Sequence, residues 1–244
     1  MINIPHWIRK FGRHELVILV AVILLAGGAW VFLELTDYVM EGDTHALDEK
    51  VLLYMRNSDD LSDPLGPKWV EELGRDFTAL GGTGVLTLLT LSVLGYLLLE
   101  YKKKTALLVV ISVGGGILLS LLLKQGFDRP RPDLVPHESH VYTTSFPSGH
   151  SMMSAVTYLT LAALLARIQK RRRNKIYLMT IAVLVTLAIG VSRIYMGVHW
   201  PSDVLAGWSA GAFWALLCWL AGSWLQRRGQ MEQEGMEPKL AQET

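Results

Sequence analysis

Apolar residues in this chain are gathered into long blocks that are separated by polar segments. A helix needs about 20 predominantly apolar residues to cross a bilayer, and six stretches meet that requirement, the fourth being the most polar. They are residues 15–36, 80–99, 105–124, 151–168, 176–194 and 203–225. The pattern predicts an all-α integral membrane protein, in which a six-helix bundle makes up a single domain over residues 1–225.

Two of the connections between these spans are long, residues 37–79 and 125–150. The first contains apolar residues at helical spacing, flanked by acids: Leu47, Val51, Tyr54 and Met55. This spacing predicts a short amphipathic helix that lies in the membrane interface. A helix that caps the bundle without touching lipid would show the same spacing, so both interpretations stay open.

Basic residues gather in alternate connections. Four segments carry them: Arg9 to Arg13, Lys102 to Lys104, Arg167 to Lys175, and Arg227 with Arg228. Residues 37–79, by contrast, hold 11 Asp or Glu against four Lys or Arg. Because Lys and Arg favour cytoplasmic loops, we expect a multi-pass protein of the cell inner (plasma) membrane with both termini in the cytoplasm. Residues 226–244 would form a polar, disordered cytoplasmic tail.

Composition narrows the functional classes. The chain is 51% hydrophobic and 18% charged, whereas about 25% of the residues of a typical soluble domain are charged. Its formal net charge of +1 gives no general attraction for nucleic acid. The single cysteine, Cys218, lies in an apolar run and cannot form an intramolecular disulfide. We therefore expect the lipid bilayer as a partner, no nucleic acid, and no obligate protein partner that the sequence indicates.

Three polar motifs lie at the ends of spans on the predicted outer side. They are Lys124-Gln-Gly-Phe-Asp-Arg-Pro-Arg-Pro132, Pro147-Ser-Gly-His150 and Ser192-Arg-Ile-Tyr-Met-Gly-Val-His-Trp-Pro-Ser-Asp203. Four cations fall within them: Lys124, Arg129, Arg131 and Arg193. A single lysine at the end of a span can extend its ammonium to the interface. Several cations on three connections, beside two histidines, instead predict an anion site.

The second motif opens the fourth predicted span with Ser148, Gly149 and His150. The free N–H groups and positive dipole at the start of a helix suit a phosphate oxygen. Gly149 would let an anion approach the backbone closely. A simple N-cap role for Ser148 explains the same residues without any ligand.

The third motif places a carboxylate close to a histidine. Pro201 suits the first turn of the sixth span, which puts Asp203 in that turn and His199 just before it. A carboxylate that accepts from one ring nitrogen fixes the tautomer and leaves the other nitrogen available as a nucleophile. His150 would then protonate the leaving oxygen. Alternatively, Asp203 only complements the helix dipole and His199 packs at the interface.

Phosphoryl transfer depends mainly on positioning and on cations. Lys124, Arg131 and Arg193 would supply these cations, so the scheme needs no metal ion and no cofactor. Five other titratable residues of the second long connection lack a recognised metal-ligand spacing: Asp128, Asp133, His137, Glu138 and His140.

Together the three motifs resemble the signature of the type 2 phosphatidic acid phosphatase superfamily. That signature reads Lys, six residues, Arg-Pro; then Pro-Ser-Gly-His; then Ser-Arg, five residues, His, three residues, Asp. It matches residues 124–203 without substitution. The six-span layout is similar to that of the membrane lipid phosphatase branch, which includes bacterial phosphatidylglycerophosphate phosphatase B and undecaprenyl diphosphate phosphatases.

The resemblance implies roles for individual residues. By it, His199 is the nucleophile that forms a phosphohistidine, Asp203 orients His199, and His150 is the general acid. The phosphate-binding residues that it implies are Lys124, Arg131, Ser148, Gly149, His150 and Arg193. Ser192 belongs to the signature without a defined role, and Arg129 lies outside the matched positions, as an electrostatic helper.

We therefore expect a metal-independent lipid phosphatase with its site open to the periplasm or the exterior. Its substrate would be a phosphomonoester or diphosphate lipid, such as undecaprenyl diphosphate, phosphatidylglycerophosphate or phosphatidic acid. A phosphotransferase with a lipid acceptor would use the same site. Vanadium haloperoxidases share the motifs but are soluble, which the six spans argue against. An anion or lipid transporter is a further alternative, although it would not need His199 paired with Asp203.

Overall fold

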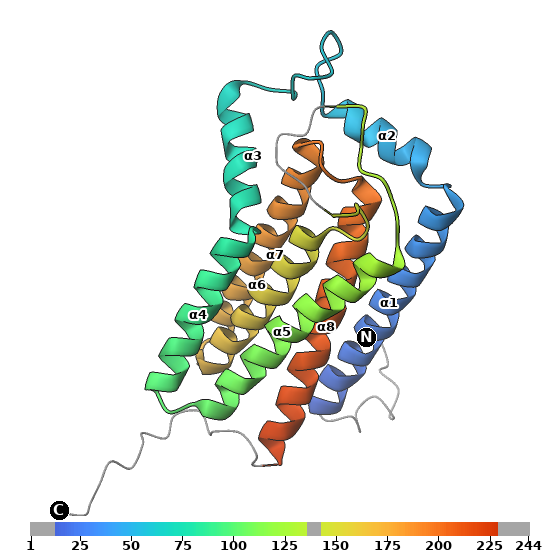
Figure 1. Ribbon diagram of the computed structural model, residues 1–244. Coiled ribbons are helices and arrows are strands. Elements are labelled where there is room, and N and C mark those ends of the chain that lie inside the picture. Colours follow the sequence, from blue (N-terminus) through green and yellow to red (C-terminus); the bar gives the residue numbers. More distant parts are fainter. Residues whose placement is uncertain (1–12, 136–142, 229–244) are drawn as a thin grey trace, which may run out of the picture.

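The computed structural model of the chain describes residues 13–135 and 143–228, which form eight α-helices and no β-sheet (Figure 1). The helices are α1 (Arg13–Glu41), α2 (His45–Tyr54), α3 (Lys68–Leu80), α4 (Thr83–Leu99), α5 (Lys103–Gly126), α6 (Gly149–Ile168), α7 (Arg172–Tyr195) and α8 (Pro201–Arg227). Several residues discussed above lie outside the described ranges: Arg9, Lys10, His137, Glu138, His140 and the tail from residue 229 onward.

The helices account for the predicted membrane spans. Five of them, α1, α5, α6, α7 and α8, are each long and apolar enough to cross a membrane. The helices α3 and α4 meet that requirement only as a pair, which is bent by 48° at its break. Counting the bent pair as one span gives six, and the prediction of an all-α, multi-span membrane protein is confirmed.

The main departure from the sequence prediction is α3, which lies where only a loop and one short helix were expected. Because α3 contains many charged residues, it does not form an apolar block and was not predicted as part of a span. One face of α3 packs on α7, where a Cβ added at Gly74 would lie 3.0 Å from Cδ1 of Tyr195. The hydroxyl oxygens of Thr78 and Ser192 lie 2.7 Å apart in the same contact.

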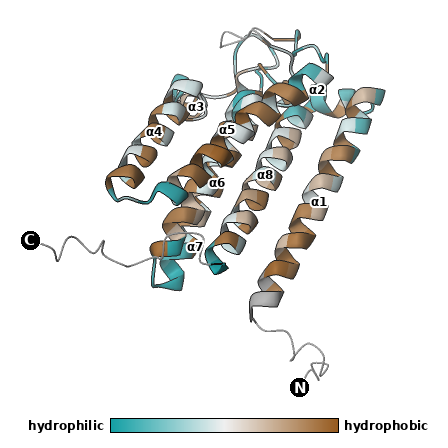
Figure 2. Cartoon of the chain, turned by 60° about the horizontal axis from the view of Figure 1, so that its bottom comes forward, coloured by the Kyte–Doolittle hydropathy of each residue, from teal (hydrophilic) through white to brown (hydrophobic). Residues whose placement is uncertain are grey.

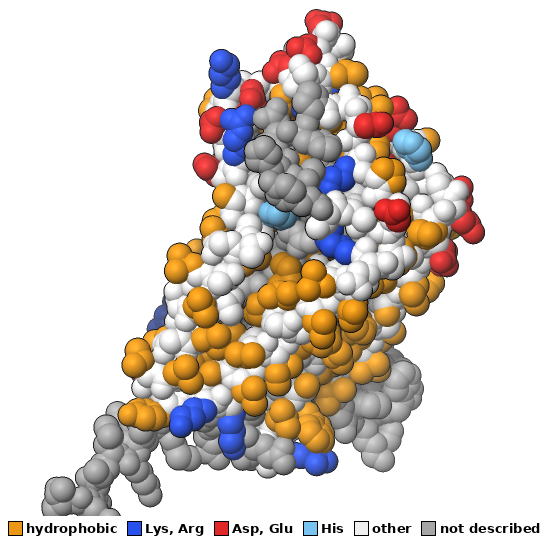
Figure 3. Space-filling model, viewed as in Figure 1, with side chains coloured by type: hydrophobic (Ala, Val, Ile, Leu, Met, Phe, Trp, Pro, Cys, Tyr) orange, Lys and Arg blue, Asp and Glu red, His pale blue; other side chains and the backbone are white. Residues whose placement is uncertain are grey.

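Side chains are sorted along the bundle as in a membrane protein. Hydropathy is high along the helix bodies and low at their ends (Figure 2), and hydrophobic side chains form a broad band on the surface (Figure 3). Acidic side chains gather at the end that holds α2 and α3, which we call the motif end. The opposite end, formed by the α4–α5 and α6–α7 connections and the end of α8, is called the basic end.

Close packing of α6 against α8 sets the geometry at the motif end. A Cβ added at Gly207 would lie 2.6 Å from the carbonyl oxygen of Ser148, and one added at Gly211 would collide with the carbonyl of Met152. Small residues four positions apart allow helix backbones to approach closely in membranes. The first turns of α6 and α8, which carry the second and third motifs, therefore lie side by side.

The helix expected in the first long connection is α2, which lies across the motif end and contacts α8. Leu52 is fully buried in a cluster that includes Trp200. Of the residues whose spacing predicted the helix, Leu47 is 65% and Tyr54 is 82% exposed. Asp48 is only 2% exposed, so the face that packs on the bundle carries an acid that the apolar spacing did not predict.

Candidate active site

The fold brings the three motifs together at one place. The backbone N–H of Ser148 donates to the carbonyl oxygen of Asp203 at 3.0 Å, which ties the second motif to the third. Nη1 of Arg131 donates to the carbonyl oxygen of Val198 at 2.6 Å, which ties the first to the third. Nζ of Lys124 donates at 2.8 Å to the carbonyl of Thr144, shortly before the second motif.

His199 lies between a carboxylate and a guanidinium. Its Nδ1 is 3.3 Å from Oδ2 of Asp203, and its Nε2 is 3.1 Å from Nη1 of Arg131. A guanidinium can only donate, so Nε2 must accept and the ring proton must sit on Nδ1, facing Asp203. In this tautomer the Nε2 lone pair points into the site. In the structure it accepts a hydrogen bond from Arg131.

Burial keeps the His199 ring neutral. The side chain is 2% exposed, and this burial lowers the pKa of His199 to about 4, even though Asp203 favours the protonated form. The cations of Arg131 and Arg193 act in the same direction as burial. A histidine with this pKa is unprotonated at neutral pH and is charged only below about pH 4, so its Nε2 can act as a nucleophile under physiological conditions.

Asp203 is held by several donors. Besides His199, its Oδ2 accepts from the backbone N–H of Trp200 at 2.9 Å and from the hydroxyl of Ser145. Its Oδ1 accepts from Nη1 of Arg129 at 2.6 Å. Asp203 is completely buried. Such a carboxylate has no freedom to rotate, and it therefore fixes the orientation of the His199 ring.

Arg193 is a buried cation with unused donors. The residue is 1% exposed, and among the described residues its Nε and Nη1 have no hydrogen-bond partner. An uncompensated buried charge is costly, and such an arrangement is expected where an anion completes the site. Burial also lowers the pKa of Arg131, the second arginine of the site.

The start of α6 adds further donors. Ser148 caps the helix, and its hydroxyl oxygen accepts from the Ser151 hydroxyl at 2.9 Å. The N-cap role considered for Ser148 is thus present in the structure. A Cβ added at Gly149 would lie 3.5 Å from Cε of Lys124, so that lysine runs alongside the helix start. Within the described residues, the side chain of the adjacent His150 has no hydrogen-bond partner, which leaves its ring available to a substrate.

Arg129 and Asp48 are the site residues that sequence reasoning placed least well. Arg129 joins Asp203 to Asp48 of α2, with Nη2 2.7 Å from Oδ2 of Asp48. The first motif contains Arg129 in an Arg-Pro-Arg-Pro run, which was a usable signal. Asp48 is one of 11 acids in residues 37–79, and nothing in the sequence distinguished it from the others.

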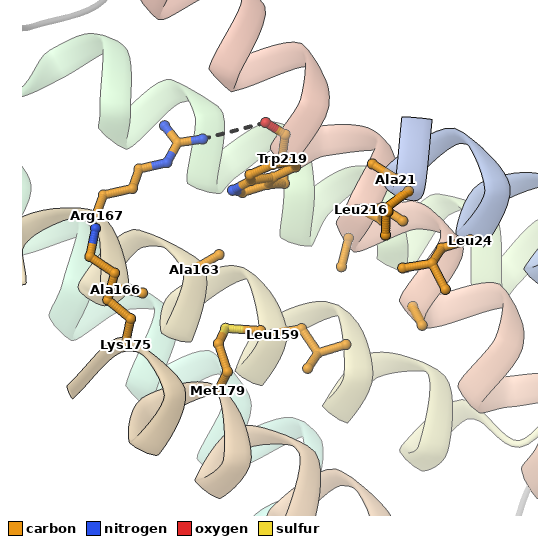
Figure 4. Close-up of a pocket in the computed structure, with 13 residues that line it drawn as sticks. Ala21, Leu24, Leu159, Ala163, Ala166, Arg167, Lys175, Met179, Leu216 and Trp219 are labelled. Carbon is orange, nitrogen blue, oxygen red and sulfur yellow. Dashed lines mark hydrogen bonds between the residues drawn. The ribbon is translucent and has the colours of Figure 1, made fainter. Parts of the chain in front are cut away.

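A cavity of about 390 Å³ opens from the site between α4, α5 and α6. Lys124, Gly149 and His150 line one part of it, and the rest is lined by apolar residues such as Leu86 and Ile117 together with hydroxyl-bearing residues such as Thr87 and Thr90. A second cavity, of about 460 Å³, lies toward the basic end among α1, α6, α7 and α8 (Figure 4). None of the motif residues lines this second cavity.

Of the five residues considered as metal ligands, two lie within the described ranges. Asp128 and Asp133 are exposed in the segment after α5. Across residues 13–135 and 143–228, no group of three or more His, Cys, Asp or Glu side chains has a geometry that could hold a metal ion. The charged groups that face the site are instead the cations of Lys124, Arg131 and Arg193.

Comparison with known proteins identifies a family and several relatives. A family model described as the PAP2 superfamily matches residues 105–227. Phosphatidylglycerophosphatase B of Bacillus subtilis is 36% identical over 149 residues, which cover 59% of this chain and 70% of that protein. Lipid A 1-phosphatase of Rhizobium etli is 28% identical over 174 residues, which cover 62% of this chain and 71% of that protein.

The fold is shared with a solved structure. The crystal structure of a transmembrane PAP2-type phosphatidylglycerolphosphate phosphatase from Bacillus subtilis aligns with a TM-score of 0.69 at 27% identity. The alignment covers 85% of this chain and 98% of that one. The matched family region contains all three motifs, so the resemblance read from the sequence is confirmed. The chain belongs to the PAP2 superfamily and is an integral membrane lipid phosphatase.

Proposed function

We propose that this phosphatase removes a terminal phosphate from a membrane lipid through a phosphohistidine on His199. The observation that carries the proposal is the buried pair of a neutral His199 and an Arg193 with unpaired donors. The first supplies a nucleophile, and the second supplies a cation for an anionic group at the same place. An anion site alone would not need the Asp203 contact that fixes the ring tautomer of His199.

In the first half of the reaction, Nε2 of His199 attacks phosphorus while the bond to the lipid oxygen breaks. His150 donates a proton to that leaving oxygen, and Asp203 stabilises the positive charge that develops on the ring. Arg131 must leave Nε2 for the phosphate to approach, and its guanidinium then binds phosphate oxygens together with Arg193. In the second half, water attacks phosphorus, His150 accepts a proton from that water, and the P–N bond breaks to release inorganic phosphate.

The cavity between α4, α5 and α6 supports a lipid substrate. It carries Lys124 and His150 at the site, while apolar side chains of the spans, with threonines among them, line the remainder. A lipid in the bilayer would thus present its phosphate to the site and its chain to the apolar part. We propose phosphatidylglycerophosphate as the substrate to test first, because a relative that is 36% identical is a phosphatidylglycerophosphatase B. Undecaprenyl diphosphate and lipid A 1-phosphate are the lipids to compare.

We further propose that the motif end faces the periplasm or the exterior. Clusters of basic residues lie at the other end, in the α4–α5 and α6–α7 connections and at the end of α8. The positive-inside rule assigns that end to the cytoplasm. An Arg172→Cys variant in a Cys218→Ala background should be labelled by a membrane-impermeant maleimide only after the cells are opened. Labelling of position 172 in intact cells would reverse the orientation.

Hydrolysis should not require a divalent metal, because lysine and arginine supply the positive charge that phosphoryl transfer needs. Purified protein in detergent should release phosphate equally well with and without EDTA, and vanadate should inhibit it as a phosphate mimic. A soluble short-chain substrate is the right choice, since metals also change the aggregation of anionic lipids. Loss of activity in EDTA with recovery in Mg²⁺ would contradict the scheme, and lipid movement in vesicles without phosphate release would favour a transporter.

A further inference from the structure

Arg129 lies at the centre of a buried polar group, of which the reaction scheme uses only Asp203. Its Nη1 donates to Oδ1 of Asp203 at 2.6 Å and to the hydroxyl of Ser202 at 2.7 Å. Its Nη2 donates to Oδ2 of Asp48 at 2.7 Å and to the hydroxyl of Thr44 at 3.3 Å. One planar guanidinium thereby connects the carboxylate beside His199 to helix α2.

Asp48 is also bound directly to the start of α8. Its Oδ1 accepts from the backbone N–H of Ser202 at 2.9 Å, and its Oδ2 accepts from the hydroxyl of Ser202 at 2.5 Å. Both carboxylates are almost completely buried, Asp48 at 2% and Asp203 at 0% exposure. A buried carboxylate needs donors that an exposed one could find in water, and Asp48 finds them in Arg129 and Ser202. These polar contacts, together with the packing of Leu52, attach α2 to the site.

The charges of Asp48, Arg129 and Asp203 together also affect how easily the His199 ring is protonated. Arg129 alone would neutralise Asp203 and weaken its support for a positive imidazole ring. The second carboxylate, that of Asp48, offsets the charge of Arg129. The trio of Asp48, Arg129 and Asp203 therefore keeps one net negative charge next to His199. Within it, Asp48 and Arg129 hold Asp203 in place.

We propose that Asp48 and Arg129 are positioning residues of this phosphatase, which hold the Asp203 carboxylate against His199 and set the charge that the ring experiences. The proposal rests on the proposed function, in which His199 is the nucleophile. It assigns a role to α2, an element outside all three motifs. Neither residue touches the phosphate site itself; both act through Asp203.

Other charged groups also face His199, and they stay constant in the test. Arg131 contacts Nε2 from the segment after α5. Arg193 of α7 and His150 of α6 interact with the ring electrostatically, and Lys124 of α5 belongs to the same cluster of charges. A change in the titration of His199 in variants of Asp48 or Arg129 can thus be attributed to the trio.

Removing the positive and the negative charge of the trio should shift the pKa of His199 in opposite directions. Arg129→Gln leaves two carboxylates near the ring, which favours its protonation, so the pKa of His199 should rise from about 4 by about one unit. Asp48→Asn leaves the trio neutral, so that pKa should fall. The double variant restores one net negative charge and should return the pKa close to the wild-type value.

The pKa is measured by ¹⁵N NMR of histidine-labelled protein in detergent, with the His199 signal assigned from its absence in His199→Gln. In parallel, kcat and KM are measured on a short-chain lipid phosphate. We expect kcat to fall about 10- to 100-fold in both single variants, the size of effect found for outer partners that orient metal-bound imidazoles, with KM little changed. In the double variant kcat should stay low, because the hydrogen bond from Arg129 to Asp203 remains lost. Glu49→Gln, which removes an acid from the same helix outside the trio, is the matched control.

Opposite pKa shifts and a restored pKa in the double variant would establish the proposal. Shifts in the same direction, or single variants indistinguishable from Glu49→Gln, would overturn it. If Arg129→Gln does not fold, Arg129→Lys keeps the charge and should give a near-normal pKa with a lowered kcat. If the wild-type protein releases no phosphate, the proposed function fails, but the titration of His199 still decides whether the trio acts on the ring.

Discussion

Replacing His199 with alanine is expected to lower phosphate release by at least about 10⁴-fold on every substrate, because removal of a catalytic nucleophile costs this much or more. His150→Ala should behave differently, since a general acid helps most when the leaving oxygen is a poor leaving group. Its loss should cost about 10²- to 10⁴-fold on an alkyl phosphate. An aryl phosphate such as p-nitrophenyl phosphate needs little proton donation, so it should recover part of that rate.

The comparison requires both variants and both substrates, measured on protein whose thermal midpoint and elution volume match those of the wild type. The ratio of aryl to alkyl rates is the informative quantity, because a general loss of structure lowers both rates together. An increase in that ratio for His150→Ala, with no rescue of His199→Ala, is expected. Selective rescue of His199→Ala by the aryl substrate would exchange the two roles.

A second large effect is expected at Arg193, a buried cation of the site whose Nε and Nη1 have no partner among the described residues. Arg193→Gln should reduce kcat by about 10³- to 10⁵-fold, the range known for arginines that stabilise a transferring phosphoryl group. Arg193→Lys keeps the charge but loses the planar fork of donors, so it should restore only part of the activity. The free protein, however, should not lose stability in Arg193→Gln, because an unpartnered buried charge is itself unfavourable.

Thermal unfolding with and without vanadate separates these two effects. The wild type should be stabilised by vanadate, and Arg193→Gln should have an unchanged or higher midpoint alone but lose the vanadate response. Arg228→Gln, at the basic end far from the motifs, is the matched control and should keep that response. A vanadate response of Arg193→Gln equal to that of the control would show that Arg193 does not bind the anion.

The sequence allowed much of this site to be predicted, because its chemistry is concentrated in short segments at helix ends. His199 and Asp203 are four residues apart across a helix start, so their contact followed from local geometry. The side-by-side placement of α6 and α8 could not be predicted as a contact, although Gly207 and Gly211 that permit it are visible in the sequence. It depends on which helices pair, and apolar blocks carry little information about pairing.

The sequence did not predict helix α3 or the role of Asp48, for different physical reasons. The helix α3 is too charged to be recognised as part of a span, and it is stabilised by its contact with α7 around Gly74 and Thr78. The burial of Asp48 could not be predicted, because it depends on Arg129, a partner 81 positions away in the sequence. Long-range pairs of single charged side chains leave no periodic pattern, so one sequence without its structure cannot identify them.

The central claim, a phosphohistidine on His199, is tested most directly by trapping the phosphoenzyme and locating the phosphate. Protein mixed briefly with ³²P-labelled substrate is quenched in alkali, in which phosphohistidine is stable, and digested with trypsin. Cleavage after Arg193 and Arg227 gives a peptide of residues 194–227 with His199 as its single histidine, whereas His150 falls in residues 125–167. We expect the label in residues 194–227 of the wild type and its absence in His199→Ala. Label in residues 125–167, or steady phosphate release with no trapped label at any quench time, would contradict the account.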